Sequence, residues 1–177
     1  MSPIVQQLNK IELKISDYYR YILSLILGRP SNFSKIDNCL FASGIPAGRR
    51  ALIWLKRAGI NAVVSLTERP ISGSEEFNPY YYNIPMINGE PVSPQVLELA
   101  TVKIGNLIKS GQCVLVHCSA GLGRTGMVLA SYFIYINHMD PDKAVEKVRA
   151  IRPGSLEDSK QVESVFKFAE WMKSKGG

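Results

Sequence analysis

The feature that most constrains this chain is the segment His117–Gly126, which joins an apolar run to a helical pattern. The apolar run is Val114-Leu115-Val116, and apolar residues recur at helical spacing after Arg124. A strand, a tight loop and a helix in this order direct backbone N–H groups and a helix N-terminus at one point. An oxyanion such as phosphate fits that point. The segment therefore predicts an anion cradle at the carboxyl end of a strand.

Two residues of this loop, Cys118 and Arg124, give it a reactive character. The dipoles that would hold phosphate also favour a cysteine thiolate, the form that attacks phosphorus. The planar guanidinium of Arg124 can hold two phosphoryl oxygens. Thr125 can donate its hydroxyl to the sulfur, and His117 can orient the loop from behind. The other residues expected to bind the phosphate are Ser119, Ala120, Gly121, Leu122 and Gly123.

An inert cysteine in a Gly-rich turn is the alternative interpretation, since cysteine is among the most buried residue types. The spacing of Cys118, Arg124 and Thr125 favours the reactive interpretation, because the chemistry needs all three at these positions. The loop lacks the pattern G-x-G-x-x-G, which disfavours dinucleotide binding.

The loop resembles the His-Cys-x5-Arg-Thr signature of the cysteine-dependent protein tyrosine and dual-specificity phosphatases. Three further segments are similar to the small atypical dual-specificity phosphatases and their archaeal relatives: Asn32-Phe33-Ser34, Val64–Arg69 and Ile151–Glu157. The resemblance covers the chain from about Asn32 to about Trp171. It implies hydrolysis of phosphomonoesters through a phosphocysteine, without a metal or another cofactor.

Strands that alternate with helices predict an α/β fold: a central, mostly parallel sheet of about four to five strands, flanked by helices. We expect a catalytic domain over 31–177, preceded by an amphipathic helix over 1–30. The expected strands are 39–42, 60–66, 80–84 and 112–117. The expected helices are 47–58, 94–109, one beginning at 124, 141–151 and one ending at 171. Ser155 and Asp158 have the spacing of a capping box for the last of these.

The N-terminal segment repeats apolar residues in alternating steps of four and three: Ile4, Leu8, Ile11, Ile15, Tyr18, Ile22 and Leu25. A helix docked on the catalytic domain, a dimer seam and a membrane-surface helix all fit this pattern. The chain could thus be a monomer or a dimer. The longest charge-free stretch is too short for a transmembrane segment, which needs about 20 apolar residues.

The proton donor is the part of the mechanism that departs from the family pattern. In relatives with an Asp-Gly-Gly loop an Asp protonates the leaving oxygen, and Asn88 falls at that position here. Glu90, two residues on, can take over as the acid. Alternatively, Asn88 marks a phosphate-binding module with impaired catalysis, or the substrates have good leaving groups. The resemblance also suggests that Gln161 helps place the water that hydrolyses the cysteinyl phosphate.

The net charge of +6 favours anionic substrates but does not choose among phosphoprotein, RNA and lipid. Ser119 and Leu122 stand where phosphoinositide phosphatases carry lysines, which disfavours polyphosphorylated head groups. We expect a phosphoprotein substrate, with phosphotyrosine and also phosphoserine or phosphothreonine accepted, and no DNA partner. An RNA 5′-triphosphatase is the alternative. Three cysteines without a secretory pattern favour a reducing compartment and a cytoplasmic location.

Overall fold

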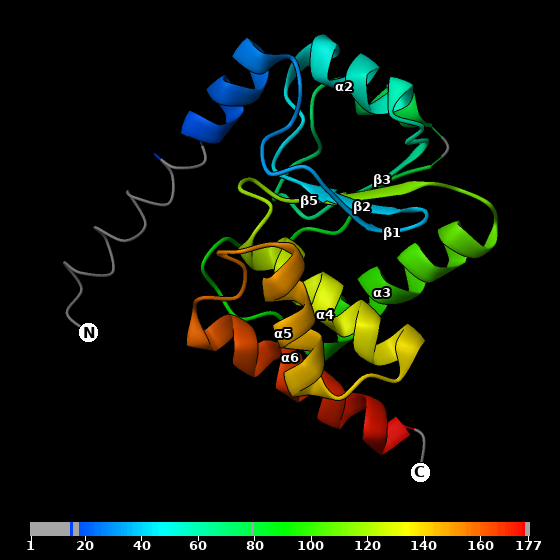
Figure 1. Ribbon diagram of the computed structural model, residues 1–177, viewed down its shortest axis with the longest axis vertical. Coiled ribbons are helices and arrows are strands. Elements are labelled where there is room, and N and C mark those ends of the chain that lie inside the picture. The colour runs from blue at the N-terminus through cyan, green and yellow to red at the C-terminus, as the bar shows by residue number, and fades with distance from the viewer. Residues whose placement is uncertain (1–14, 16–17, 79, 176–177) are drawn as a thin grey trace.

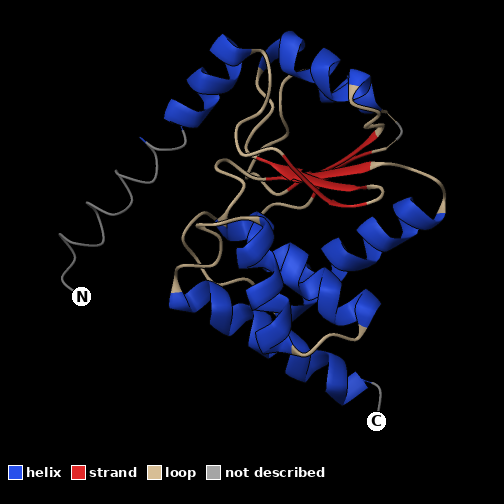
Figure 2. Cartoon of the chain, viewed as in Figure 1, coloured by secondary structure: helices blue, strands red, loops and turns tan. Residues whose placement is uncertain are grey.

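A five-stranded sheet forms the middle layer of the protein, with its strands in the order β1-β2-β5-β3-β4 (Figures 1 and 2). The computed structural model describes residue 15, residues 18–78 and residues 80–175. The strands are β1 (Ser34–Asp37), β2 (Leu40–Ser43), β3 (Ala62–Ser65), β4 (Tyr81–Asn83) and β5 (Val114–His117). All neighbouring pairs are parallel except β1 and β2, which are antiparallel. The predicted fold class is therefore confirmed.

Helices cover both faces of the sheet (Figure 1). On one face lies α2 (Gly48–Arg57), together with a helix over residues 18–27. On the other face lie α3 (Pro94–Lys109), α4 (Gly123–Asn137), α5 (Pro141–Ile151) and α6 (Ser159–Lys175), and α4 packs against the other three. A short 3₁₀ helix, η1 (Ser74–Phe77), lies within the segment after β3. Among the described residues, no helix is long and apolar enough to cross a membrane.

The central strand β5 is buried on both of its faces because it lies between two apolar clusters. Val114 and Val116 belong to the cluster formed with α3–α6, whereas Leu115 belongs to the cluster formed with α2. This alternation follows from the two-residue period of a strand. Cys118 continues the alternation and joins the first cluster. The carboxyl end of β5 therefore delivers the reactive loop to the edge of the core.

Two local expectations differ from the structure. The sequence does not predict strand β1, which lies at the edge of the sheet and pairs with β2. Its four residues alternate between half-buried and exposed. A run of four residues is too short to give a clear alternation of apolar and polar residues in the sequence. The expected capping box is wrong. Asp158 accepts a hydrogen bond from the Lys160 N–H at 2.9 Å and so caps α6, but the buried Ser155 hydroxyl has no hydrogen-bond partner among the described residues.

The helix over 18–27 contacts the start of α2. The buried Ser24 hydroxyl accepts a hydrogen bond from the Ala47 N–H at 2.9 Å, and a Cβ added to Gly48 would meet Leu25 Cδ2 at 2.6 Å. By contrast, Ile15 and Tyr18 of the predicted heptad pattern are 64% and 69% exposed. Residues 1–14 and 16–17 of the predicted helix lie outside the described residues. The oligomeric state and membrane association stay predictions.

Candidate active site

The loop after β5 holds its carbonyl oxygens away from its centre. Each carbonyl oxygen from Cys118 to Leu122 has a hydrogen-bond partner. In chain order the partners are His117 Nδ1 (3.3 Å), Ile45 N (2.9 Å), Asn32 Nδ2 (2.8 Å), Arg152 Nη2 (2.6 Å) and Gly126 N (3.0 Å). Because C=O and N–H point in opposite directions in a planar trans peptide, the N–H groups of residues 119–123 turn inward. Inward N–H groups at a helix N-terminus form an anion cradle.

The Cys118 sulfur lies inside this cradle. Its residue is 2% exposed, and the Gly121 N–H donates a hydrogen bond to Sγ at 3.2 Å. Gly121 has a φ of 80°, and a Cβ at this position would overlap the backbone of Ser43 and Gly44. Only glycine therefore allows the loop to turn this closely against the end of β2.

The Arg124 guanidinium is held by three separate parts of the chain. Nη2 donates to Ser119 Oγ at 2.8 Å, and Nη1 donates to the Met86 carbonyl at 2.9 Å and to Glu68 Oε2 at 3.0 Å. Arg124 is only 2% exposed. These contacts fix the plane of the guanidinium beside the cradle, as bidentate recognition of phosphoryl oxygens requires.

Glu68, which follows β3, is a site residue that the sequence did not single out. Its Oε2 pairs with Arg124, and its Oε1 accepts a hydrogen bond from the Asn88 N–H at 3.0 Å. Partial burial raises the pKa of this carboxyl. Hydrogen bonds from its own backbone N–H and from Asn88, together with the charge of Arg124, outweigh that effect and hold the pKa below its ordinary value. Glu68 therefore remains a carboxylate that positions Arg124.

His117 supports the loop from within the core. Burial lowers the pKa of its imidazole to about 4; the hydrogen bond to the Cys118 carbonyl opposes this shift, and the charge of Arg124 adds to it. The ring is therefore neutral at pH 7. Its Nε2 has no hydrogen-bond partner among the described residues. This position behind the loop agrees with the orienting role expected for His117.

Asn88, which stands at the position of the family's acid, and the candidate acid Glu90 lie on one turn. The Glu90 N–H donates to the Ile87 carbonyl at 3.3 Å, and Gly89 has a φ of 78°. The backbone of Asn88 is connected to Arg124 through Glu68, so the turn lies beside the cradle. Asn88 is half-buried and Glu90 is exposed. The structure thus brings this turn to the site, with Glu90 at its solvent side.

Gln161 and Thr125 both lie at the loop. A Cβ added to Gly123 would meet Gln161 Nε2 at 2.5 Å, so the side chain of Gln161 packs directly against the cradle.

The Thr125 hydroxyl is fully buried in the first turn of α4. It has no hydrogen-bond partner in the described part of the chain, so the expected bond to the Cys118 sulfur is not formed in this structure.

Arg152 is a second residue that the sequence did not assign to the site. It is 3% exposed and donates to the carbonyls of Gly121 at 2.6 Å and Ala42 at 3.3 Å. Burial lowers the pKa of Arg152, and the neighbouring Cys118 opposes that shift. Arg152 therefore joins the loop to β2 from behind. The only feature of the sequence that pointed to Arg152 was its place in the Ile151–Glu157 segment, which resembles the family.

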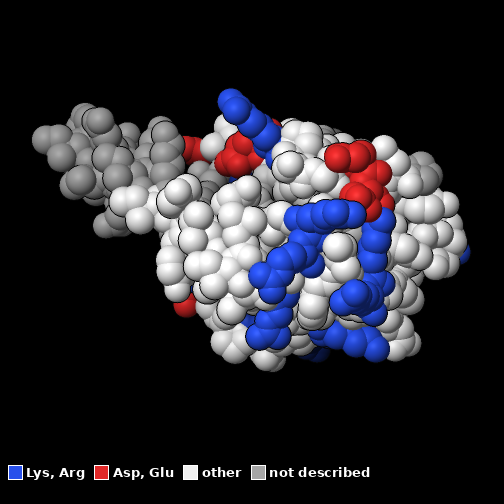
Figure 3. Space-filling model, turned by 90° about the horizontal axis from the view of Figure 1, so that it is seen from above, with Lys and Arg blue, Asp and Glu red and all other residues white. Residues whose placement is uncertain are grey.

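Basic side chains gather on one surface of the molecule. Figure 3 shows Lys and Arg side chains gathered over the α2 side of the molecule, where Arg49, Arg50, Lys56 and Arg57 are exposed. Among the described residues, no group of three or more His, Cys, Asp or Glu could hold a metal ion.

The comparison with known protein families identifies the class of this protein. The model of the family described as "Dual specificity phosphatase, catalytic domain" matches residues 49–170, which is most of the chain. The chain therefore belongs to the dual specificity phosphatase family. This confirms the resemblance drawn from the reactive loop.

Individual relatives agree with this assignment. The chain is 32% identical over 132 residues to "Protein tyrosine phosphatase domain-containing protein 1" of Danio rerio, a match that covers 71% of this chain and 18% of that protein. It is 42% identical over 57 residues to "Phosphatidylglycerophosphatase and protein-tyrosine phosphatase 1" of Rattus norvegicus, covering 29% of this chain and 30% of that protein. The crystal structure of Tk-PTP in the active form matches with a TM-score of 0.72 and 29% identity, covering 78% of this chain and 97% of that one. The chain thus spans a minor part of these two curated relatives.

Proposed function

We propose that this chain is a protein phosphatase that hydrolyses phosphotyrosine, and also phosphoserine and phosphothreonine, through a phosphocysteine at Cys118. The observation that carries the proposal is the position of Cys118 Sγ inside a ring of inward N–H groups, with the Arg124 guanidinium fixed beside it. A nucleophile and preorganised donors around one point are what phosphoryl transfer requires.

In the first step the Cys118 thiolate attacks phosphorus in line with the leaving oxygen. The S–P bond forms as the bond between phosphorus and the substrate oxygen breaks. The N–H groups of residues 119–123 and the guanidinium of Arg124 stabilise the charge on the three remaining oxygens. Because these donors are already in place, little reorganisation is needed in the transition state.

Glu90 donates the proton to the leaving oxygen in this proposal. The amide of Asn88 has no acidic proton to give, and Glu68 is a poor donor because its pKa is lowered and its carboxylate is paired with Arg124. Glu90 lies on the same turn as Asn88, which reaches the site through Glu68. A positioned acid of this kind contributes about 10²–10⁴-fold to the rate.

In the second step water attacks the phosphocysteine. Gln161, packed against Gly123, orients that water, and the carboxylate of Glu90 accepts its proton. The S–P bond breaks and inorganic phosphate leaves.

The decisive experiment is the hydrolysis of para-nitrophenyl phosphate by the purified protein in the presence of EDTA. Cys118→Ser is expected to reduce kcat by about 10⁴-fold or more, as removal of a nucleophile does in other enzymes. Cys39→Ser and Cys113→Ser are the matched controls, because both residues are free thiols away from the cradle. Mass spectrometry of acid-quenched protein should find one phosphoryl group on the peptide that carries Cys118. Turnover that survives Cys118→Ser contradicts the mechanism.

A substrate panel tests the substrate class. Phosphotyrosine and phosphoserine peptides should have higher kcat/KM than a 5′-triphosphorylated RNA or phosphatidylglycerophosphate in micelles. The last substrate is included because the rat relative carries that activity in its name. Higher kcat/KM for the RNA or the lipid contradicts the assignment to phosphoproteins.

A further inference from the structure

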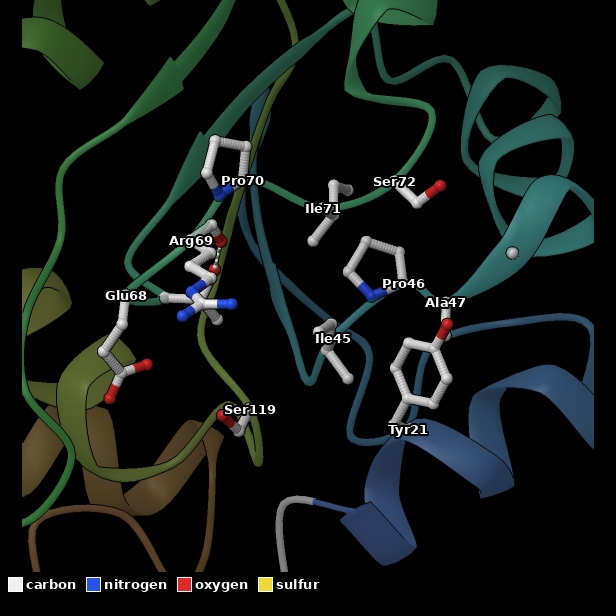
Figure 4. Close-up of a pocket in the computed structure, with 12 residues that line it drawn as sticks. Tyr21, Ile45, Pro46, Ala47, Glu68, Arg69, Pro70, Ile71, Ser72 and Ser119 are labelled. Atoms are coloured by element: carbon white, nitrogen blue, oxygen red, sulfur yellow. Dashed lines mark hydrogen bonds between the residues drawn. The ribbon is translucent and has the colours of Figure 1, made fainter. Parts of the chain in front are cut away.

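A cavity of about 330 Å³ lies directly beside the phosphate cradle (Figure 4). Its walls come from residues 45–48 before and at the start of α2, from residues 67–72 after β3, and from Tyr21 of the N-terminal helix. Ser119 of the cradle also lines it. The cavity therefore begins where the bound phosphate would be and extends away from it toward the N-terminal helix.

The lining of the cavity combines polar and apolar side chains on different walls. Figure 4 shows Glu68 and Arg69 on the side of Ser119, and Tyr21 on the opposite side near Ala47. The remaining surface is largely hydrocarbon, contributed by Ile45, Pro46, Pro70 and Ile71. A ligand that reaches from the cradle into this space thus meets Glu68 and Arg69 on one wall and hydrocarbon on the others.

The position of Tyr21 is set by the contacts of its helix. Tyr21 precedes Ser24 by three residues and Leu25 by four, so all three lie on one face of the helix. Ser24 bonds to the Ala47 N–H, and Leu25 lies against Gly48. Tyr21 itself is 38% exposed, compared with 69% for Tyr18 one turn earlier. The docked end of the helix therefore carries Tyr21 as a wall of the cavity.

We infer that this cavity is a substrate subsite for the apolar side chain of a residue next to the phosphorylated residue, with Tyr21 as its specificity-determining wall. The inference rests on the proposed function. A peptide fits this lining, since its main chain would meet Glu68 and Arg69 while one side chain contacts the apolar walls. The volume lies at the lower end of the roughly 300–1,000 Å³ of ligand pockets, which suits one side chain rather than two acyl chains.

The test uses two phosphotyrosine peptides that differ only in the residues on either side of the phosphotyrosine, Leu in one and Ser in the other. The readout is the ratio of their kcat/KM values, which is independent of the overall activity of a variant. The wild-type chain should favour the Leu peptide by about tenfold, the size of discrimination that a small apolar contact supplies. Tyr21→Ala should bring the ratio close to one, and Tyr21→Phe should keep it because the ring is retained. Tyr18→Ala is the matched control and should also keep it.

Binding separates failure of the subsite from failure of catalysis. The dissociation constants of both peptides for the Cys118→Ser protein are measured by calorimetry, with and without Tyr21→Ala. A Tyr21-dependent preference in binding without any turnover by the wild type supports the subsite and contradicts the proposed function. Turnover of both peptides at equal kcat/KM overturns the subsite, as does a preference that survives Tyr21→Ala. A lipid substrate provides one further outcome. The subsite for a peptide side chain is also overturned if the kcat/KM ratio of short-chain phosphatidylglycerophosphate to glycerol phosphate depends on Tyr21 and exceeds the ratio of the two peptides.

Discussion

The cradle around Cys118 and the turn that carries Glu90 are built very differently. The cradle that holds Cys118 is fixed by hydrogen bonds from Ile45, Asn32, Arg152 and its own helix, and Cys118 is 2% exposed. In the turn over 87–90 the Glu90 N–H donates to the Ile87 carbonyl and the Asn88 N–H donates to Glu68, and the side chain of Glu90 is exposed. The proposed nucleophile thus belongs to the core, whereas the proposed acid belongs to the surface.

In this chain the departure from the family pattern falls at Asn88 on the turn, whereas the cradle keeps the His-Cys-x5-Arg-Thr signature. A change in the cradle leaves buried carbonyls or donors unpaired, which costs about 1–3 kcal/mol for each group. A change on the exposed turn costs little stability, because the side chains there are largely in water. Surface turns can therefore alter their chemistry while the fold and the phosphate site stay intact. Four predictions test this contrast.

The largest effect is expected for Arg124→Lys. One ammonium group cannot replace the contacts to Ser119, Met86 and Glu68 and also hold two phosphoryl oxygens. We expect kcat/KM for para-nitrophenyl phosphate to fall about 10³-fold, as for loss of a preorganised transition-state donor. The control variant Arg57→Lys, on the exposed face of α2, should leave kcat/KM unchanged. A loss smaller than tenfold for Arg124→Lys contradicts the role of the guanidinium.

The second prediction concerns the pH dependence of stability caused by His117. Its pKa is about 4 in the folded protein and near 6.5 when unfolded, so the unfolded state binds more protons between these values. The free energy of unfolding should therefore fall as the pH drops from about 6.5 to about 4, by on the order of 3 kcal/mol.

Urea unfolding of wild type, His117→Asn and His138→Asn between pH 7 and pH 4 measures this effect. The His117 variant should be less stable at pH 7 and should lose most of this pH dependence. His138 is exposed after α4, and its variant should follow the wild-type curve. Equal pH dependence in the wild type and the His117 variant contradicts the assignment.

The third prediction tests the exposed turn through the leaving group. Glu90→Gln should lower kcat/KM for a phosphoserine peptide about 10²-fold, because an alkoxide needs protonation. The loss for para-nitrophenyl phosphate should be much smaller, since its phenolic oxygen leaves readily. Glu75→Gln in η1 is the exposed control. Equal losses for both substrates contradict Glu90 as the acid. Large activation by Asn88→Asp in the otherwise wild-type chain would instead identify a phosphate-binding module with impaired catalysis.

The smallest effect is expected for Arg152→Met. Methionine fills similar space but removes the hydrogen bonds to the Gly121 and Ala42 carbonyls. The free energy of unfolding should fall by about 2 kcal/mol, the usual cost of orphaned buried groups. Activity should fall by about tenfold as the cradle loosens. Lys143→Met on the exposed side of α5 serves as control. Unchanged activity in a destabilised Arg152→Met would show that the loop keeps its shape without this support.

The part of the protein that could be predicted from sequence is the part that depends on neighbours along the chain. The strand, loop and helix around Cys118 follow from local apolar periodicity and from the types of residue between them. The starts of α3 at Pro94 and of α5 after Asp140 can be predicted in the same way. Proline is favoured at the first position of a helix, and Asp is favoured as the residue that caps its N-terminus. The prediction of a capping box was wrong because both Ser155 and Asp158 are residue types that cap a helix N-terminus, but only Asp158 bonds to the start of α6.

Other features depend on which segments the fold brings together. Glu68 and Arg152 reach the loop from residues far away in the sequence, at separations of 56 and 31 positions from their partners. Their contacts exist because β5 lies between β2 and β3, so that the ends of three strands meet at one edge. Tyr21 enters the cavity only through the docking of its helix at Ala47. The sequence by itself thus determined the proposed nucleophile and its cradle, whose geometry is local. The tertiary structure decided what surrounds and supports them, because strand order and helix docking are set by long-range packing rather than by any local pattern.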